Sequence, residues 1–482
     1  MMILENLYPG RVFYYFEQIA GIPHGSGNTR AISNYLVDFA KAHSLKYRQD
    51  EKNNVIIFKD ATPGYEAAEP VIIQGHMDMV CEKEQGVEID FEKDGLALEI
   101  ADGYVCAKGT TLGGDDGIAI AYALTLLESK DLAHPRLEVV VTVDEEIGMF
   151  GAMDIDLSVL KGRRMLNIDS EEEGHFLTSC AGGIAVHAKL PVNRVTKKGV
   201  LLRLAVTGLV GGHSGAEIHR ERGNANILMG RFLCALSRQT SMGICSLAGG
   251  QKDNAIPREC TAEIIVEQNE VLLVKRVAQQ MQEIFRQELA VSDKEAVVVC
   301  VEAGSAEAAA LDQDSAGRVI AYLRMVPNGV QSRCQAMPQM VETSLNLGIL
   351  ELTADSLNMV TSIRSSVRTR KEELLERVGT LVGLLGGTYE TTGDYPAWEY
   401  LQESQLRDRI SRVYEDIYGE PPVFESIHAG LECGIFSEKL PGLDCVSFGP
   451  DIEDIHTPKE RLNIASVGRV WDFLVDFLRQ EK

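Results

Sequence analysis

The sequence predicts an α/β domain that is interrupted by an inserted α+β domain. Short apolar runs, each followed by acidic or histidine residues, occupy residues 71–169 and return at residues 428–456. Polar residues in this position are typical of α/β sheets, whose ligand sites lie at the carboxyl ends of the strands. Because the pattern is found on both sides of a different middle segment, we expect two separated parts of the chain to form the first domain.

The first two predicted strands each end in a pair of candidate site residues. Residues 71–75 lead into His76 and Asp78, which lie two positions apart and can face one site. The β-branched run at residues 137–143 leads to the adjacent Glu145 and Glu146. Consecutive side chains of an extended chain point to opposite sides, so one glutamate can bind a metal while the other faces a substrate.

Two further predicted strands bring one candidate ligand each. Residues 165–168 end at Asp169, and residues 445–448 end in a Gly-Pro loop that leads to His456. Taken singly, such residues are common, and the acidic run that follows Asp169 is typical of an exposed loop. Their combination is unusual, because a buried cluster of acids and histidines needs metal ions to stabilise it. The sequence therefore predicts a metal site.

A glycine-rich stretch at residues 109–117 adds Asp115 to this set. The apolar residues that follow have helical spacing, which puts Asp115 at a predicted helix N-terminus. A phosphate-binding loop is the alternative interpretation. The stretch lacks both the Gly-Lys-Ser/Thr ending of a P-loop and the Gly-x-Gly-x-x-Gly of a dinucleotide site, so we favour a metal ligand.

The order of these signals predicts the domain boundaries. We expect residues 1–182 and 394–482 to form the first domain and residues 183–393 to form the insert, which ends at a turn-rich junction. Within the insert, strand-like runs at residues 201–206, 262–266 and 296–300 accompany a helical stretch at residues 272–289. This mixture predicts an α+β domain.

Composition excludes several classes of protein. The 482-residue chain has a net charge of -24, which disfavours binding to nucleic acid or to anionic membrane surfaces. We expect no membrane span and no signal peptide, because no apolar run approaches about 18 residues and the N-terminus lacks a basic start. The ten dispersed cysteines fit reduced thiols and a cytoplasmic location.

The insert carries one further motif, at residues 208–215, which includes His213. This stretch contains no acid that could make His213 part of a second metal centre. From spacing alone, the motif predicts a hairpin turn with an exposed histidine.

Together these segments resemble the M20 metallopeptidases, and most closely the bacterial aminoacyl-histidine dipeptidases. The matching segments occur in the family's order and span nearly the whole chain. They are residues 75–80 (GHMDMV), 111–117 (TLGGDDG), 143–148 (VDEEIG), 167–169 (NID), 211–215 (GGHSG), 428–434 (HAGLECG) and 455–458 (IHTP).

The resemblance implies a di-zinc peptidase catalytic domain with an inserted lid domain. The five implied metal ligands are His76, Asp115, Glu146, Asp169 and His456. Asp115 would bridge the two ions, which lie about 3.5 to 4 Å apart in two-metal sites. His76 and Asp169 would complete one ligand set, and Glu146 with His456 the other. Zinc suits imidazole and carboxylate ligands, although Mn²⁺ or Co²⁺ would fit the same residues.

The resemblance also implies catalytic and substrate-binding residues. Glu145 would be the general base for a metal-bridging water, and Asp78 would orient His76 through its far nitrogen. His213 would donate a hydrogen bond to the oxyanion of the tetrahedral intermediate. Arg364 would bind the substrate carboxylate, and Asn254 would also contact the substrate.

We therefore expect a cytoplasmic dipeptidase that hydrolyses unblocked dipeptides, including Xaa-His types. The alternatives are a deacylase or carboxypeptidase of the same family acting on N-acyl amino acids, and a non-catalytic metal-binding scaffold. Retention of Glu145, which is not needed as a ligand, argues against the scaffold. A homodimer is one of two arrangements to consider, because related lids mediate dimers whereas an enlarged lid can replace the partner.

Overall fold

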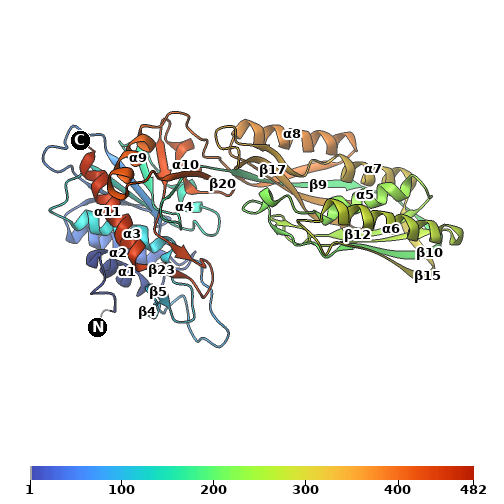
Figure 1. Ribbon diagram of the computed structural model, residues 1–482, viewed down its shortest axis with the longest axis horizontal. Coiled ribbons are helices and arrows are strands. Elements are labelled where there is room, and N and C mark those ends of the chain that lie inside the picture. Colours follow the sequence, from blue (N-terminus) through green and yellow to red (C-terminus); the bar gives the residue numbers. More distant parts are fainter. Residues whose placement is uncertain (1–2, 482) are drawn as a thin grey trace. The chain divides into compact units, whose positions relative to one another are not determined.

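The computed structural model describes residues 3–481, and contacts within the chain divide it into two units (Figure 1). Unit 1 comprises the described residues of Met1–Ser179, Tyr400–Ser426 and Leu431–Lys482. Unit 2 comprises Cys180–Glu399 and Ile427–Gly430. The chain thus leaves unit 1 near residue 180, and the boundaries at residues 182 and 393 that we expected from the sequence stay a prediction.

Unit 1 is built on an eight-stranded sheet with the order β1-β2-β6-β3-β7-β21-β8-β20. The strands are β1 Lys46–Gln49, β2 Val55–Lys59, β3 Val71–His76, β6 Leu137–Thr142, β7 Arg164–Asn167, β8 His175–Cys180, β20 Val423–Ile427 and β21 Asp444–Ser447. The four central strands, β6, β3, β7 and β21, are parallel to one another. Their carboxyl ends therefore meet at one edge of the sheet.

The helices of unit 1 are α1 Gly10–Ala20, α2 Arg30–Ala42, α3 Gly114–Glu128, α4 Phe150–Asp154, α9 Gln405–Tyr418, α10 Glu432–Lys439 and α11 Ile464–Gln480. Strands β3 and β6 are buried along their whole length, as expected of parallel strands that are covered on both faces. Helix α3 packs against both strands, and nearly all of its residues are buried. This burial explains its almost uniformly apolar sequence after residue 117.

A smaller antiparallel sheet in unit 1 joins two distant parts of the chain. It has the order β22-β23-β5-β4, with β4 Leu98–Ala101, β5 Tyr104–Ala107, β22 Ile452–Glu453 and β23 Arg461–Asn463. Residues 454–460, which include His456, form the loop between β22 and β23. The pairing of β23 with β5 fixes the position of this loop.

Unit 2 contains a nine-stranded antiparallel sheet with the order β15-β10-β14-β12-β17-β18-β9-β19, to which β16 adds by pairing with β17. Its strands are β9 Gly182–Pro191, β10 Arg194–Thr207, β12 Gly243–Gly249, β14 Cys260–Val266, β15 Val297–Leu311, β16 Gly329–Arg333, β17 Val341–Leu352, β18 Ser356–Ser365 and β19 Thr388–Tyr395. A short pair, β11 Gly212–His213 and β13 Ala255–Ile256, lies outside this sheet.

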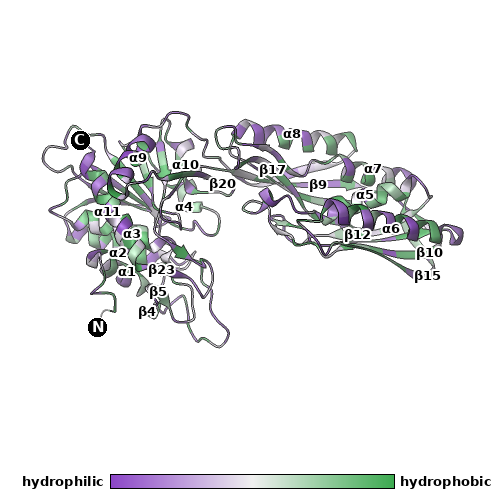
Figure 2. Cartoon of the chain, in the orientation of Figure 1, coloured by the Kyte–Doolittle hydropathy of each residue, from purple (hydrophilic) through white to green (hydrophobic). Residues whose placement is uncertain are grey.

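Four helices pack on this sheet: α5 Ala225–Ser237, α6 Val271–Glu288, α7 Gln313–Met325 and α8 Arg368–Leu384 (Figure 1). Helix α6 buries Val274, Met281 and Phe285. Figure 2 shows that the helix also contains hydrophilic residues. The prediction of a mixed α/β fold with an α+β insert is confirmed. None of the helices within residues 3–481 has both the length and the apolar character needed to cross a membrane.

Candidate metal centre

The predicted ligands of unit 1 converge at the carboxyl edge of its parallel strands. His76 is the last residue of β3, Glu146 follows β6 and Asp169 follows β7. Asp115 lies at the start of α3, and His456 lies in the loop between β22 and β23. The topology therefore brings together residues that are up to 380 positions apart, from His76 to His456.

Asp115 lies between the two histidines. Its Oδ1 atom is 3.1 Å from His76 Nε2, and its Oδ2 atom is 3.1 Å from His456 Nε2. An acid accompanies each histidine, because Asp169 Oδ1 is 3.5 Å from His76 Nε2 and Glu146 Oε1 is 3.0 Å from His456 Nε2. The cluster thus contains two sets of nitrogen and oxygen atoms, and each set includes one oxygen of Asp115.

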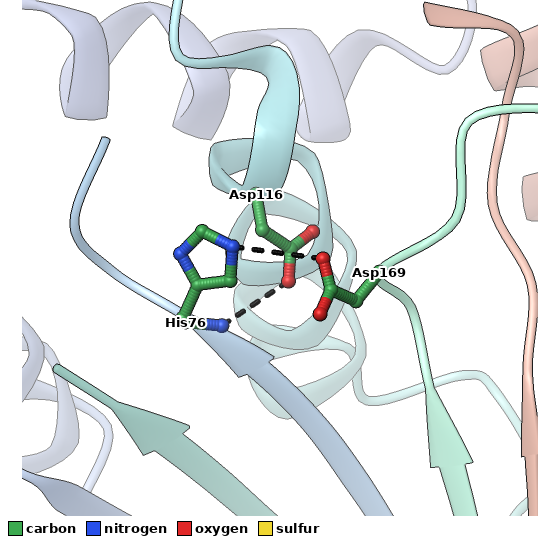
Figure 3. Close-up of side chains that lie close together, drawn as sticks. All are labelled: His76, Asp116 and Asp169. Atoms are coloured by element: carbon green, nitrogen blue, oxygen red, sulfur yellow. Dashed lines mark hydrogen bonds and ion pairs between the residues drawn. The ribbon is translucent and has the colours of Figure 1, made fainter. Parts of the chain in front are cut away.

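Asp116 also lies in this cluster, although the sequence analysis assigned it no role. Figure 3 shows His76, Asp116 and Asp169 around a common point, and these three residues offer ligand atoms that lie within 4.8 Å of one another. The peptide bond between Asp115 and Asp116 is cis. Asp116 Oδ2 accepts a hydrogen bond of 3.1 Å from the His76 backbone N–H, so this carboxylate already supports the end of β3.

Gly75 is required by this arrangement. A Cβ atom at Gly75 would lie 2.3 Å from Asp116 Oδ2 and 2.6 Å from the Ala119 Cβ atom. Any side chain at this position would therefore push the start of α3 away from β3. The glycine was part of the family motif in the sequence, but only the structure reveals its contact with Asp116.

The imidazole of His76 is oriented by a hydrogen bond from its far nitrogen. Nδ1 donates to the Asp78 carbonyl oxygen at 2.9 Å, whereas the Asp78 carboxylate is 3.6 Å away. This bond fixes the tautomer and leaves Nε2 for a metal ion. We expected the carboxylate to play this part, and in the structure it instead accepts hydrogen bonds from Ser26 Oγ and from the backbone N–H groups of Glu145 and Glu146.

The charge balance of the cluster fits a bound cation. Burial lowers the pKa of His76, but neighbouring carboxylates, first that of Asp115, raise it well above the ordinary value. The Asp115 and Glu146 carboxylates raise the pKa of His456 to about 10. Glu146 Oε1 is buried, and it lies 3.0 Å from His456 Nε2 in this ion pair. These carboxylates favour positive charge beside the Nε2 atoms of both histidines. A divalent ion bound by nitrogen and oxygen atoms would supply that charge.

Glu145 occupies a different position from its neighbour Glu146. Its backbone N–H donates to Asp78 Oδ1 at 3.1 Å, and its carboxylate takes part in no hydrogen bond or ion pair among the described residues. Burial raises the pKa of Glu145 well above its ordinary value. The residue is thus fixed through its main chain, while its carboxylate makes no hydrogen bond to another described residue. Such a carboxylate is available for proton transfer.

A buried polar network lies beneath the cluster and was not foreseen from the sequence. Glu432, at the start of α10, accepts hydrogen bonds from Gln74 of β3 at 2.5 Å and Thr142 of β6 at 2.6 Å. Asn167 of β7 donates to Gln74 at 2.6 Å. These bonds join the ends of three strands that lead to candidate ligands. Burial raises the pKa of Glu432 to about 7.

The candidate substrate-binding residues belong to unit 2. His213 Nδ1 accepts hydrogen bonds from the backbone N–H groups of Gly215 and Ala216, so the proton of a neutral imidazole lies on Nε2. Burial, followed by the charge of Arg364, lowers the pKa of His213. A Cβ atom at Gly215 would lie 3.0 Å from His213 Cε1 and 3.2 Å from Arg364 Nε. His213 and Arg364 are therefore close neighbours around this glycine.

Arg364 lacks an acidic partner among the described residues. Its Nη1 donates to the Tyr395 hydroxyl at 2.7 Å, and its buried Nε has no hydrogen-bond partner in the part of the chain that the structure describes. His428 belongs to one of the segments that resemble the family, although the sequence analysis assigned it no role. It lies beside the same loop, because its carbonyl oxygen would be 2.5 Å from a Cβ atom at Gly215. The exposed Asn254 accepts the Ser214 N–H through its backbone carbonyl, and no hydrogen bond holds its side chain within residues 3–481.

The fold and this arrangement define a peptidase of the M20 type, and comparisons with known proteins agree. The model of peptidase family M20/M25/M40 matches residues 72–480. The chain therefore belongs to this family.

Its relatives include the cytosol non-specific dipeptidase of Escherichia coli, which is 36% identical over 482 residues, covering 100% of this chain and 99% of the relative. The crystal structure of the aminoacylhistidine dipeptidase from Vibrio alginolyticus matches 98% of this chain and 97% of its own, with 36% identity and a TM-score of 0.94. An aminopeptidase from Bacillus cereus shares the fold, with a TM-score of 0.57 over 98% of this chain and 99% of its own at 15% identity. The predicted family and the predicted enzyme class, a hydrolase of peptide bonds, are confirmed.

The two sets of donors lead to a prediction about metal content. Because each set includes one oxygen of Asp115, Asp115→Ala should lower occupancy at both positions, whereas His456→Ala should mainly empty one. Elemental analysis of the purified proteins measures this, with the exposed Asp38→Ala as a matched control that should retain the wild-type content. Two full metal equivalents in Asp115→Ala would contradict the prediction and make Asp116 the next candidate for the bridge.

Proposed function

We propose that this chain is a di-zinc dipeptidase that hydrolyses unblocked dipeptides, including Xaa-His types. The observation that carries the proposal is the position of Asp115, whose two oxygens face different histidines, each accompanied by an acid. The full-length similarity to proteins named as dipeptidases supports the substrate class. The name of the Escherichia coli relative likewise supports a cytosolic location.

His76, Asp115 and Asp169 would hold one zinc ion, and Asp115, Glu146 and His456 the other. When bound, the two ions would polarise the scissile carbonyl group and increase the acidity of the attacking water. The tautomer of His76 supports this assignment, because its Nδ1 proton is donated to the Asp78 carbonyl oxygen and Nε2 remains as the ligand atom. Mn²⁺ or Co²⁺ could replace zinc at the same donor atoms.

Glu145 would act as the general base, taking a proton from the attacking water at its carboxylate and passing it to the leaving amine. Support comes from its backbone hydrogen bond to Asp78, which also accepts the N–H of Glu146. Asp78 would thus position the base and one ligand through the same carboxylate. This role differs from the one the sequence suggested, in which the Asp78 carboxylate bonds to His76.

The residues of unit 2 would bind the substrate and stabilise the transition state. His213 would donate its Nε2 proton to the oxyanion, which its acceptor contacts at Nδ1 favour. A preorganised donor of this kind contributes on the order of 3 kcal/mol. Arg364 would bind the terminal carboxylate, because its buried Nε finds no hydrogen-bond partner within residues 3–481. Asn254 would make a further substrate contact through its exposed side chain. A homodimer stays a prediction.

The role of Glu145 gives a test of the mechanism. Glu145→Gln keeps the size of the side chain but removes the proton acceptor, so kcat should fall by at least about 10²-fold with metal content unchanged. Steady-state kinetics and elemental analysis measure the two quantities. Glu51→Gln, in an exposed turn, is a matched control that should behave as wild type. Loss of one metal ion from Glu145→Gln would indicate that Glu145 is a ligand and that its role and that of Glu146 are exchanged.

The substrate class is tested with four compounds: Gly-His, its C-terminal amide, a tripeptide and an N-acetyl amino acid. Gly-His should be hydrolysed fastest, and the amide should lose about 10²-fold in kcat/KM because Arg364 would be left without an anion. In Arg364→Gln, the difference in kcat/KM between Gly-His and its amide should be smaller than in the wild type. Preference for the N-acetyl compound would indicate a deacylase instead, and wild-type protein that turns over none of the four would indicate a non-catalytic scaffold.

A further inference from the structure

One buried carboxylate holds the whole loop that precedes α3. Glu460 is 3% exposed, and its oxygens accept hydrogen bonds from four consecutive backbone N–H groups. Oε2 accepts from Leu112 at 2.8 Å and Gly113 at 3.2 Å. Oε1 accepts from Gly114 at 2.8 Å and Asp115 at 3.4 Å. The loop that carries Asp115 is therefore fixed to residue 460 through its main chain.

The conformation of the loop is suited to this contact. Gly113 has φ of +66°, a left-handed value that other residues rarely adopt, and this turn directs successive N–H groups toward one point. A Cβ atom at Gly114 would lie 3.2 Å from Glu460 Oε1, so a side chain there would crowd the carboxylate. Because four successive main-chain N–H groups donate to the two oxygens of one side chain, Glu460 holds this loop at a single point.

Glu460 does not have the geometry of a further metal ligand. Each of its two oxygens already accepts two N–H groups, which uses the positions that a carboxylate oxygen offers to donors. Its contacts with the Asp115 segment are to main-chain atoms. Glu460 therefore contacts the Asp115 segment through its main chain and not as a ligand.

The same short segment also supplies His456. Residues 454–460 form a compact turn, in which Thr457 Oγ1 donates to the Asp454 carbonyl oxygen at 2.7 Å and the Glu460 N–H donates to the Thr457 carbonyl oxygen at 3.1 Å. His456 lies 3.1 Å from Asp115 Oδ2, and Glu460 binds the Asp115 N–H. One segment thus contacts both the side chain and the main chain of Asp115.

We infer that Glu460 is a positioning residue, which fixes the main chain at Asp115 so that the two carboxylate oxygens face the two metal positions. This inference rests on the proposed role of Asp115 as the shared ligand. It extends that proposal by assigning a function to a carboxylate that touches neither metal nor substrate. Because Asp115 would serve both metal positions, loss of the hydrogen bonds to Glu460 weakens metal binding at both.

The test compares metal affinity in three variants of the full chain. Glu460→Gln keeps one acceptor oxygen but replaces the other with an NH2 group, which cannot accept from the loop N–H groups. Glu460→Asp keeps both oxygens but shortens the side chain. The matched control is Glu453→Gln, which alters a partly exposed glutamate of β22 that pairs with Tyr104 and Arg461. Affinity for Zn²⁺ is measured by competition with a chelator, and Co²⁺ absorption reports the ligand geometry.

Glu460→Gln should weaken Zn²⁺ binding by about 10- to 100-fold and change the Co²⁺ spectrum, as expected when a residue that supports a ligand is lost. Glu460→Asp should show a smaller loss, and Glu453→Gln should stay within about twofold of wild type. The thermal stability of the metal-free proteins is measured alongside. A purely structural role would lower that stability and leave the affinity and the spectrum of the folded protein unchanged.

Asp115→Ala in the same assay separates this inference from the proposed function. If Asp115→Ala loses metal at both positions while Glu460→Gln binds like wild type, the positioning role is wrong and the metal centre stands. If Asp115→Ala binds like wild type, the shared-ligand proposal itself is wrong. Should Glu460→Gln fail to fold, wild-type affinity in Glu460→Asp would overturn the positioning role, and weakened affinity would support it.

Discussion

The sharing of Asp115 between His76 and His456 is the interaction on which the rest of the site depends. Acids and histidines are gathered at the carboxyl edge of four parallel strands. The side chains of His76, Asp115, Glu146 and Asp169 are at most 10% exposed, whereas that of His456 is 44% exposed. Burying carboxylates at such short separations is unfavourable without a compensating positive charge. The raised pKa of each histidine shows the same demand for a cation. Two divalent ions, one on either side of Asp115, would supply this positive charge.

Several residues of unit 1 support this arrangement without being candidate ligands themselves. Asp78 binds the main chain of Glu145 and Glu146, Glu432 joins the ends of the strands, and Glu460 holds the loop before α3. Each is a buried carboxylate that accepts hydrogen bonds instead of occupying a ligand position. Such supports limit how far the candidate ligands can move, which the proposed binding of two ions a fixed distance apart would require.

The sequence was most informative about local structure and residue type. The β-branched run before Glu145 and the apolar run before His76 predicted strands that are present as β6 and β3. The mixed pattern of the insert predicted the α+β character of unit 2. These features depend on periodicity, which a sequence displays directly.

Long-range hydrogen bonds could not be predicted in this way. Glu460 and Leu112 are 348 positions apart, and nothing in the composition around Glu460 distinguishes it from an exposed charge. The bond from His76 to the carbonyl group of Asp78, instead of its carboxylate, depends on a side-chain rotamer and a turn of the main chain. The support that Asp116 gives to β3 could not be predicted either, because it depends on a backbone N–H at the end of a different strand.

Anomalous diffraction from crystals grown with zinc and a non-hydrolysed dipeptide analogue tests the central claim most directly. The account predicts two zinc peaks about 3.5 to 4 Å apart, with one oxygen of Asp115 bound to each ion. His76 and Asp169 should bind one ion, and Glu146 and His456 the other. A single peak, or two peaks joined by Asp116 with Asp115 unbound, would contradict it.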